Sequence, residues 1–394
     1  MVLKNQPSRM DRFDKHGKAI LNSDFTPVKK HHFRKYILGG LIVITIGATV
    51  FASAITHNVK HTIDKTYSAA NVIKSRNVNQ VLKDHKPFSI LLMGTDTGEL
   101  NRDDKGRTDS IMIVTINPNT ESISLVSLPR DATVAIDGFE NTFPQKLNSA
   151  YTFGSAATSI KEVQDYLNIP IDFYALVNMG GLEKLINQVN GIQVKSPLDF
   201  TYSQDTAHDY GPHLYRFTKG SSTYQYSESG NESDFVTKTS MDGDAALAFS
   251  RMRYDDPLGD YGRQLRQRLV LETLIKKSGN VSTVLNTKFM SSVSANVKTD
   301  LTFDDLLTIG RNYINTRKNI NSDHLQGQDV MYNGVSYEVV PQSEKQRVTN
   351  EIRKNLDLDA AKTGRTFGGD IDKSTIDPVF TNAADDDQSP DASQ

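Results

Sequence analysis

Apolar residues occur along this chain in runs of two lengths, and each length predicts a different structure. Residues 37–55 form one unbroken stretch without a charged side chain. In a helix, ~19 residues at about 1.5 Å each reach about 28 Å, close to the ~30 Å core of a bilayer. The later runs are short and bounded by turn residues, as is typical of buried strands. The pattern therefore predicts one membrane-spanning helix followed by a folded domain.

Basic residues flank the long apolar run on its amino-terminal side. Residues 29–35 combine lysine, arginine and histidine, whereas only scattered lysines follow the run. Because basic flanks stay on the cytoplasmic side of a membrane, we expect residues 1–36 to be a cytoplasmic leader. The carboxyl-terminal domain of this single-pass cell membrane protein is then extracellular. Small residues at 52–54 suit cleavage, but the long leader favours an uncleaved signal-anchor.

The periodic segments after the apolar run predict alternating strands and helices. Residues 88–93, 110–116 and 122–128 have the pattern of strands, and a turn at 117–120 joins the last two into a hairpin. Further strands are predicted at 173–177 and 335–340, and helices at 156–167, 181–189, 242–250, 261–277, 303–313 and 342–356. Strands that alternate with helices indicate a layered α/β domain.

Three segments lack this clear periodicity. Residues 56–86 are polar with a weakly helical pattern, and they predict a stalk between the membrane and the domain. Residues 201–240 are rich in Ser, Tyr, Thr and Gly, and they predict an irregular excursion or lid. The end of the chain is acidic and polar. We therefore expect the domain to span 87–356 and a disordered tail to span 357–394.

The composition narrows the classes of function. The chain has 45 basic and 47 acidic residues, a formal net charge of -2, which argues against a protein that coats nucleic acid along its length. It has no cysteine, which excludes disulfides, thiolate metal ligands and thiol nucleophiles. It also lacks a Gly-rich loop ending in Lys and Ser or Thr, and a dinucleotide fingerprint. Its histidines give no support to a Ser–His–Asp relay.

Two aspartates adjoin the first two predicted strands. Asp96 follows the strand at 88–93, and Asp109 precedes the strand at 110–116. If these strands are antiparallel neighbours, both carboxylates meet at one edge of the sheet. Such hard oxygen ligands suit Mg²⁺ better than Zn²⁺. The competing interpretation is that both aspartates only form turns.

Arginines gather near the hairpin and near the helix at 261–277. Arg107 lies two residues before Asp109, and Arg130 follows a proline that takes the chain out of the sheet. The denser cluster comprises Arg251, Arg253, Arg263, Arg266 and Arg268, with Gln267 one turn after Arg263. Crowded guanidinium groups repel unless an anion lies among them, and their planar fork matches phosphate oxygens. Opposite a magnesium site the cluster predicts a pyrophosphate-binding site, and a solvated basic helix is the alternative.

Four stretches of the sequence resemble the LytR-CpsA-Psr family of wall glycopolymer ligases, with the LytR branch most similar. They are LLMGTDTG, GRTDSIMIVTINP, VSLPRD and DGDAALAFSRMRYDDPLGDYGRQLRQR. The segments KLNSAY and VNMGGLEKLINQVNGIQV are also similar, so the resemblance covers most of the external domain. One departure is that residues 97–100 contain no arginine, whereas many members have one shortly after the first aspartate. Arg102 is a candidate substitute.

The resemblance implies a central mixed β-sheet sandwiched between helices, with a tunnel for a polyprenyl chain. It implies an extracytoplasmic phosphotransferase that moves an anionic glycopolymer, such as teichoic acid or capsule, from polyprenyl pyrophosphate to peptidoglycan. Nucleic acid is not an expected partner. Carried over to this sequence, the resemblance makes Asp96 and Asp109 the Mg²⁺ ligands, gives catalytic roles to Arg130, Arg251 and Arg253, and assigns pyrophosphate binding to Arg107, Arg263 and Gln267.

Two other functions stay open at this point. A pyrophosphatase would act on the same lipid with water as the acceptor, and a membrane-bound regulator or attenuator of cell wall metabolism would bind without reacting. The expected topology opposes contact with DNA, because the arginines would lie across the membrane from the chromosome. Asp131 and Asp260 are candidates for a general base, or they orient the guanidinium groups beside them.

Overall fold

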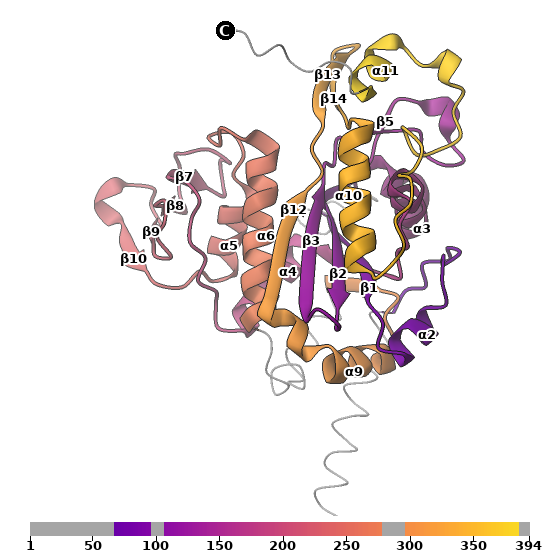
Figure 1. Ribbon diagram of the computed structural model, residues 1–394. Coiled ribbons are helices and arrows are strands. Elements are labelled where there is room, and N and C mark those ends of the chain that lie inside the picture. The colour runs from indigo at the N-terminus through magenta and orange to yellow at the C-terminus, as the bar shows by residue number, and fades with distance from the viewer. Residues whose placement is uncertain (1–66, 96–105, 278–295, 386–394) are drawn as a thin grey trace, which may run out of the picture. The chain divides into compact units, whose positions relative to one another are not determined.

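The computed structural model describes residues 67–95, 106–277 and 296–385, and its centre is a six-stranded sheet (Figure 1). In spatial order the strands are β11 (Val297–Thr299), β6 (Phe173–Asn178), β1 (Phe88–Thr95), β2 (Thr108–Asn117), β3 (Ser122–Leu128) and β12 (Asn319–His324). Strands β1, β2 and β3 form an antiparallel meander, whereas β6 runs parallel to β1 and β12 runs parallel to β3. The expected mixed sheet and its hairpin are confirmed.

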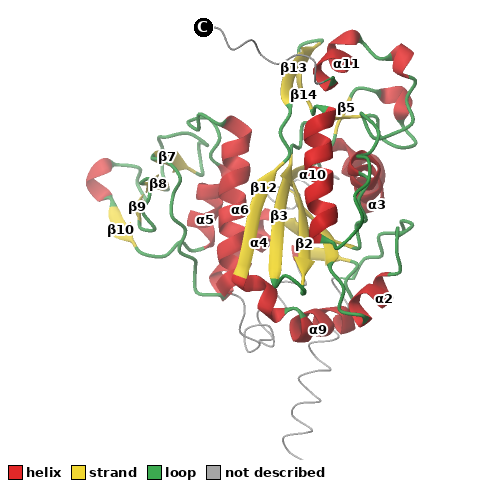
Figure 2. Ribbon diagram, in the orientation of Figure 1, coloured by secondary structure: helices red, strands yellow, loops and turns green. Residues whose placement is uncertain are grey.

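Helices cover both faces of this sheet (Figure 2). The α-helices of the described residues are α2 (Val78–Lys83), α3 (Ser149–Leu167), α4 (Met179–Gln188), α5 (Gly243–Arg251), α6 (Gly259–Lys277), α9 (Phe303–Asn312), α10 (Gln342–Asn355) and α11 (Pro378–Ala384). Successive side chains of a strand point to opposite faces. Leu91 and Ile113 therefore pack in the core that contains α3 and α10, while Leu92 and Met112 pack in the core that contains Leu271 of α6.

A second sheet occupies the segment that we expected to be irregular. Its four antiparallel strands are, in order, β10 (Val236–Lys238), β9 (Tyr224–Ser227), β8 (Leu214–Phe217) and β7 (Phe200–Ser203). Aromatic residues such as Phe200 and Phe217 stack with ring centroids 4.7 Å apart and share a core with Phe249 of α5. The expectation of an irregular 201–240 excursion was wrong, because these three- and four-residue strands are stabilised by packing against helices α4 to α6.

The folded unit extends beyond both expected ends. Within the expected stalk, Val81 and Leu82 of α2 are buried against the sheet. Within the expected disordered tail, Phe367 and Phe380 are buried in a core with the hairpin of β13 (Gln328–Tyr332) and β14 (Val335–Val339). The described parts of both segments are therefore packed on the domain. A small hairpin of β4 (Thr133–Val134) and β5 (Gln145–Lys146) completes the sheets described here.

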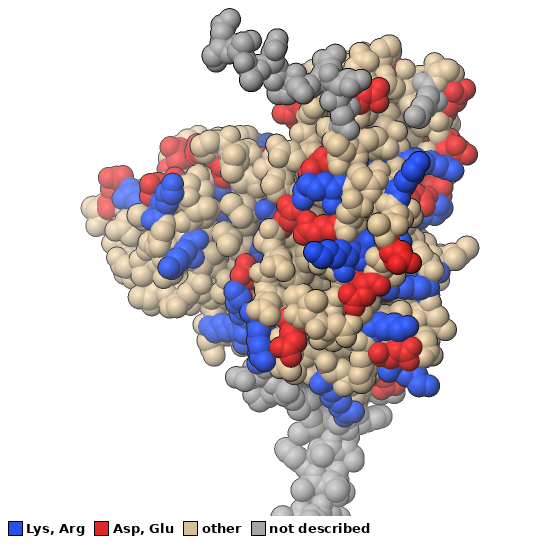
Figure 3. Space-filling model, in the orientation of Figure 1, with Lys and Arg blue, Asp and Glu red and all other residues tan. Residues whose placement is uncertain are grey.

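The expected membrane span at 37–55 lies outside the described residues. Among the residues that are described, no helix is both long enough and apolar enough to cross a bilayer. On the face shown in Figure 3, basic and acidic side chains alternate over the surface without forming one large field of a single sign. This face therefore has no extended basic field that would attract anions.

Candidate functional site

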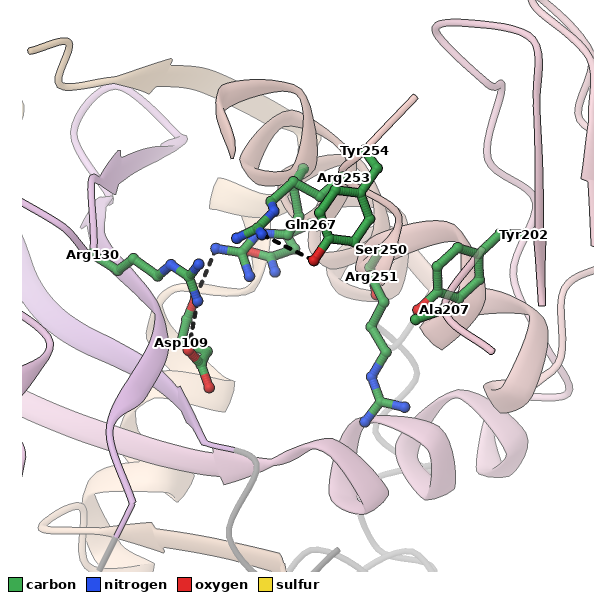
Figure 4. A pocket seen from close by; sticks show the side chains of 10 residues that line it. Asp109, Arg130, Tyr202, Ala207, Ser250, Arg251, Arg253, Tyr254 and Gln267 are labelled. Carbon is green, nitrogen blue, oxygen red and sulfur yellow. Dashed lines mark hydrogen bonds and ion pairs between the residues drawn. The ribbon is translucent and has the colours of Figure 1, made fainter. Parts of the chain in front are cut away.

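Residues from distant parts of the sequence converge on one polar cavity of about 250 Å³ (Figure 4). Its lining residues are Asp109, Arg130, Tyr202, Ala207, Ser250, Arg251, Arg253, Tyr254, Arg263 and Gln267. Six of them were predicted from the sequence as site residues: Asp109, Arg130, Arg251, Arg253, Arg263 and Gln267. Because the arginines surround a single cavity, their charges add there and favour an anionic ligand.

The sheet supplies one wall of the cavity. Asp109 is the second residue of β2, and Arg130 comes two residues after the end of β3. Ile111 pairs with Leu128 across the antiparallel ladder, so Asp109 and Arg130 face each other just beyond that pair. Their side chains form an ion pair in which Arg130 Nη1 lies 2.7 Å from Asp109 Oδ1. The hairpin thus fixes the position of both residues.

Helices α5 and α6 supply the other wall. The side chain of Asp242 caps the first turn of α5, and Arg251 is the last residue of that helix. Arg263 and Gln267 lie one turn apart on α6 and therefore share a face. Figure 4 shows Arg251 extended into the cavity across from Arg130. An anion in the cavity would contact guanidinium groups from both walls.

Asp260 links two of these guanidinium groups. Its Oδ1 lies 2.7 Å from Arg263 Nη2 and 3.9 Å from Arg130 Nε. Burial alone would raise the pKa of Asp260, but Arg263 and Arg130 outweigh burial and lower it, so the carboxylate stays ionised. Asp131 approaches Arg130 Nε at 3.7 Å and Lys146 Nζ at 3.0 Å. Both carboxylates are thus placed to orient the cations beside them.

Arg130 and Arg263 differ in how their surroundings act on their charge. Burial lowers the pKa of Arg263, and the neighbouring Arg130 adds to this effect against the attraction of Asp260. Burial also opposes the charge of Arg130, but Asp260, Asp131 and Asp109 together outweigh burial and raise its pKa. The buried Nε atoms of both arginines have no hydrogen-bond partner within the described chain. Phosphate oxygens would satisfy such donors and reduce the repulsion between the two cations.

An apolar cavity of about 300 Å³ adjoins the polar one. The two cavities share Ser250 and Gln267. The other lining residues come from the sheet and from α4 and α6, and they are Leu92, Met93, Gly94, Ser110, Met112, Val177, Asn178, Leu182, Leu185, Val270, Leu271, Leu274 and Val297. A polar cavity for an anion beside an apolar one is suited to an amphiphile with an anionic head and a hydrocarbon tail.

The two remaining site residues predicted from the sequence are Asp96 and Arg107. Asp96 falls outside the described residues, although Thr95, which precedes it, pairs with Thr108 beside Asp109. Arg107 is described and exposed, and its side chain is not part of the lining. The sheet therefore brings Thr95 to the edge where Asp109 lies, the position of Asp96 stays a prediction, and Arg107 is exposed to solvent.

The arginine cluster on α6 divides into two groups. Arg263 lines the cavity, whereas Arg266 is fully buried and pairs with Asp256. Arg268 donates from Nε to Ser322 Oγ of β12 at 2.8 Å. Sequence spacing alone placed all of these arginines in one cluster, and only the packing of α5 and β12 around α6 separates them. Arg266 and Arg268 are structural residues.

Four cavity residues were not identified from the sequence. Ser250 and Tyr254 flank the predicted arginines, so their positions in the chain are a weak signal. Tyr202 and Ala207 belong to the segment whose fold we did not predict. The many tyrosines of residues 201–240 are the sequence feature that could have indicated a binding surface there.

A buried carboxyl group connects this site to the β13–β14 hairpin. Glu338 of β14 accepts hydrogen bonds from the Tyr261 hydroxyl and from the backbone N–H of Gly327, the latter at 3.0 Å. Burial, to which Asp260 and Asp131 add against the hydrogen bond from Gly327, raises the pKa of Glu338 to about 8. Tyr261 lies between Asp260 and Arg263 along α6, so this contact fixes the start of the helix that carries the site.

The raised pKa of Glu338 predicts how stability depends on pH. Between the ordinary pKa of 4.5 and about 8, the folded protein keeps a proton that the unfolded chain has lost. This contribution therefore reduces stability as pH rises through that range. Glu338→Gln removes the titration, so its melting temperature relative to wild type should rise between pH 5 and pH 9. Thermal unfolding at both pH values measures this, and a constant difference would contradict it.

Comparison with known proteins gives a consistent set of matches. A model of the LytR_cpsA_psr family matches residues 51–354. An Enterococcus faecalis protein named polyisoprenyl-teichoic acid--peptidoglycan teichoic acid transferase TagU is 39% identical over 321 residues, which cover 81% of this chain and 96% of that protein.

Solved structures also match this chain. A Streptococcus agalactiae protein has 35% identity and a TM-score of 0.61, covering 75% of this chain and 95% of its own. A structure of TagT bound to LIIa-WTA has 26% identity and a TM-score of 0.53, covering 73% of this chain and 95% of its own. These proteins therefore share both the sequence pattern and the fold described above.

Proposed function

The chain belongs to the LytR-CpsA-Psr family, and on that premise we propose that it transfers an anionic glycopolymer of the teichoic acid class from a polyprenyl pyrophosphate carrier to peptidoglycan. The observation that carries the proposal is the junction of the two cavities at Ser250 and Gln267. A lipid pyrophosphate has one charged and one hydrocarbon part, and each part finds a matching cavity.

In this reaction a hydroxyl oxygen of peptidoglycan attacks the phosphorus that carries the glycopolymer. The bond from that phosphorus to the bridging oxygen breaks, and polyprenyl phosphate leaves with the electron pair and takes up the hydroxyl proton, so that a phosphodiester remains. Arg130 and Arg263 bind the phosphate oxygens and stabilise the charge that develops on them. Arg251 and Arg253 hold the pyrophosphate from the α5 side, and Gln267 positions it at the mouth of the apolar cavity.

Asp260 has a positioning role in this proposal. Its lowered pKa and its contacts with Arg263 and Arg130 keep it negatively charged and engaged. Asp131 is likewise engaged, by Arg130 and Lys146. Carboxylates that already bind cations are poor acceptors for the proton of the attacking hydroxyl. We therefore assign both the role of orienting guanidinium groups, the second of the two roles considered from the sequence.

Asp109 and Asp96 are the proposed ligands of Mg²⁺. The carboxylate of Asp109 lines the polar cavity, and within the described chain only its Oδ1 takes part in a hydrogen bond, donated by Arg130. The described residues contain no group of three or more metal-binding side chains, so phosphate oxygens and water would complete the shell. When bound, Mg²⁺ would neutralise charge on the pyrophosphate.

Asp109→Asn should weaken binding of Mg²⁺ at least tenfold, because an amide oxygen carries no full negative charge. Isothermal titration of the full-length protein with MgCl₂ measures this without reference to activity. Asp137→Asn is the matched control, since Asp137 pairs with Lys161 at the surface and does not line the cavity. Equal Mg²⁺ affinity in the Asp109→Asn variant and wild type would exclude Asp109 as a ligand.

The proposed substrates place the domain outside the membrane, with residues 37–55 as its anchor. The uncharged run and its basic amino-terminal flank support this topology. Reporter fusions at the two termini test it. A cytoplasmic carboxyl terminus would contradict the topology.

A transfer assay tests the reaction itself. The full-length protein in detergent is incubated with a lipid-linked teichoic acid precursor, with or without polymer-free peptidoglycan. We expect the polymer to sediment with peptidoglycan and polyprenyl phosphate to be released. Release without attachment, at the same rate whether or not peptidoglycan is present, would instead identify a pyrophosphatase.

A further inference from the structure

Three exposed aromatic rings lie together at the rim of the polar cavity, and we call them the aromatic ledge: His208, Tyr210 and Tyr254. His208 stacks on Tyr210 with ring centroids 5.5 Å apart and an interplanar angle of 10°. It also contacts Tyr254 at 5.9 Å. Tyr210 is 62% exposed and Tyr254 is 68% exposed, so the rings pack on each other rather than in a core. A cluster of exposed aromatic rings is a candidate binding surface.

The ledge belongs to the same site as the arginines. Tyr254 lines the polar cavity, and so does Ala207, the residue before His208 (Figure 4). The guanidinium carbon of Arg253 lies 4.9 Å from the centre of the Tyr254 ring, and Arg253 Nη2 donates to the Tyr254 hydroxyl at 3.2 Å. The cation therefore holds one ring of the ledge in place. A molecule lying on the ledge reaches directly into the cavity.

Helix α6 shows the order of the binding regions. Leu274, Leu271 and Val270 line the apolar cavity, Gln267 lines both cavities, and Arg263 lines only the polar one. At about 1.5 Å per residue, the distance along the axis from Leu274 to Arg263 is about 16 Å. Tyr254 precedes the first turn of the helix. Along α6 the order is therefore apolar cavity and then polar cavity, and Tyr254 of the ledge lines the polar one.

This order has a chemical consequence if the proposed function holds. In phosphoryl transfer the attacking and leaving oxygens lie roughly in line with the phosphorus. The leaving polyprenyl phosphate departs toward the apolar cavity, so the attacking hydroxyl approaches from the opposite side. Tyr254 of the ledge lines the polar cavity and does not line the apolar one, so the ledge is on the side available to the acceptor. It is open to solvent, as entry of a polymeric acceptor requires.

The charges around the ledge favour binding of the acceptor over binding of the donor polymer. Asp209 lies between His208 and Tyr210, Asp255 follows Tyr254, and both aspartates are exposed. A phosphate-rich glycopolymer would be repelled by these carboxylates, whereas the uncharged sugar rings of peptidoglycan would not. The flat C–H face of a pyranose ring also packs well on an aromatic face, since both surfaces are apolar.

We propose that the aromatic ledge binds sugar rings of the acceptor glycan strand and presents a sugar hydroxyl to the phosphorus. This inference rests on the proposed function, and it adds the binding surface for the second substrate. Tyr210→Ala should raise the KM for soluble, uncross-linked peptidoglycan strands about tenfold. The KM for the lipid-linked donor and the kcat should stay within twofold of wild type, because Tyr210 does not line the cavity.

Two further variants of the full-length protein make the test specific. Tyr210→Phe keeps the ring and should retain the wild-type acceptor KM. Tyr67→Ala removes a tyrosine that is 48% exposed beside β11, where the backbone makes the bridge to Thr299, and it should change neither KM. An unchanged acceptor KM in Tyr210→Ala, or a rise in the donor KM instead, would overturn the inference and leave the proposed function standing.

A direct binding measurement separates failure of the inference from failure of the reaction. Wild-type protein should sediment with polymer-free peptidoglycan in the absence of any donor, and Tyr210→Ala should do so about tenfold more weakly. If no transfer occurs but this difference is found, the ledge is a glycan site and only the reaction is refuted. Equal sedimentation of the two proteins would refute the ledge as a glycan site.

Discussion

Arg130→Ala is expected to lower the rate of polymer transfer about 10³-fold, the range found when one donor to a developing phosphate charge is removed. Arg130 lies just beyond the end of β3 and forms ion pairs with both Asp109 and Asp260. Its replacement removes the donor and leaves the carboxylates of Asp109, Asp131 and Asp260 without their shared cation. Those carboxylates would then repel the pyrophosphate, so binding of the donor should weaken as well as the chemical step.

Two matched variants test whether the loss of rate is specific to the guanidinium group of Arg130. Arg130→Lys keeps a positive charge but loses the planar fork, and we expect a smaller loss of about 10- to 100-fold. Arg311→Ala removes an exposed arginine from the last turn of α9 and should leave the rate unchanged. The rate of product formation from lipid-linked donor measures all three. If Arg130→Ala keeps more than a tenth of the wild-type rate, the cavity is not the reaction centre.

The central meander was predictable because its strands are buried on both faces. Strands β1 and β2 contain continuous apolar runs, β3 alternates serine with apolar residues, and a turn separates β2 from β3. Strand β12 has the sequence NINSDH and is largely exposed, so no apolar pattern marks it. It forms because β3 offers an open edge to which it can pair in parallel. Edge strands of this kind are set by tertiary pairing rather than by local sequence.

Other differences also have physical causes. The predicted helix at 156–167 is the second part of α3, which is kinked at Gly154 and Ser155, where the backbone leaves helical geometry. The described part of the expected tail has few apolar residues, but Phe380 packs in a core together with Phe143 and Phe367. A few large aromatic side chains can stabilise a segment whose average composition is polar.

The polar cavity was largely predictable from residue type and spacing, because arginines brought so close together need a nearby anion or carboxylate. Which arginines face the cavity was not predictable. Helix α6 has polar residues on every side, and Arg263 and Arg266 are separated only by what packs on each side of the helix. Little in the sequence indicated the ledge, since His208 and Tyr254 are far apart in the chain and are brought into contact by the fold.

Arg266 has the largest expected effect on stability. Its side chain has no exposed surface and that of Asp256 is 4% exposed. Besides this ion pair, Arg266 donates from Nε to the carbonyl oxygen of Phe249 at 2.9 Å, and from Nη2 to that of Met252. Arg266→Ala leaves the Asp256 carboxylate buried without its cation, which costs about 3–5 kcal/mol. We expect the melting temperature to fall by about 10 °C.

An exposed ion pair shows how much of this stability loss comes from burial. Arg216 and Glu232 are 2.5 Å apart, and their side chains are 34% and 81% exposed. Arg216→Ala should cost less than about 1 kcal/mol of stability, because water solvates the remaining charge.

The double variant Arg266→Met with Asp256→Asn should melt at a higher temperature than Arg266→Met alone, since the amide removes the unpaired buried charge. Thermal unfolding of the variants measures these differences. If Arg266→Met melted at the wild-type temperature, α5 and α6 would not depend on this ion pair, and the packing that aims Arg251 and Arg263 at the cavity would need another explanation.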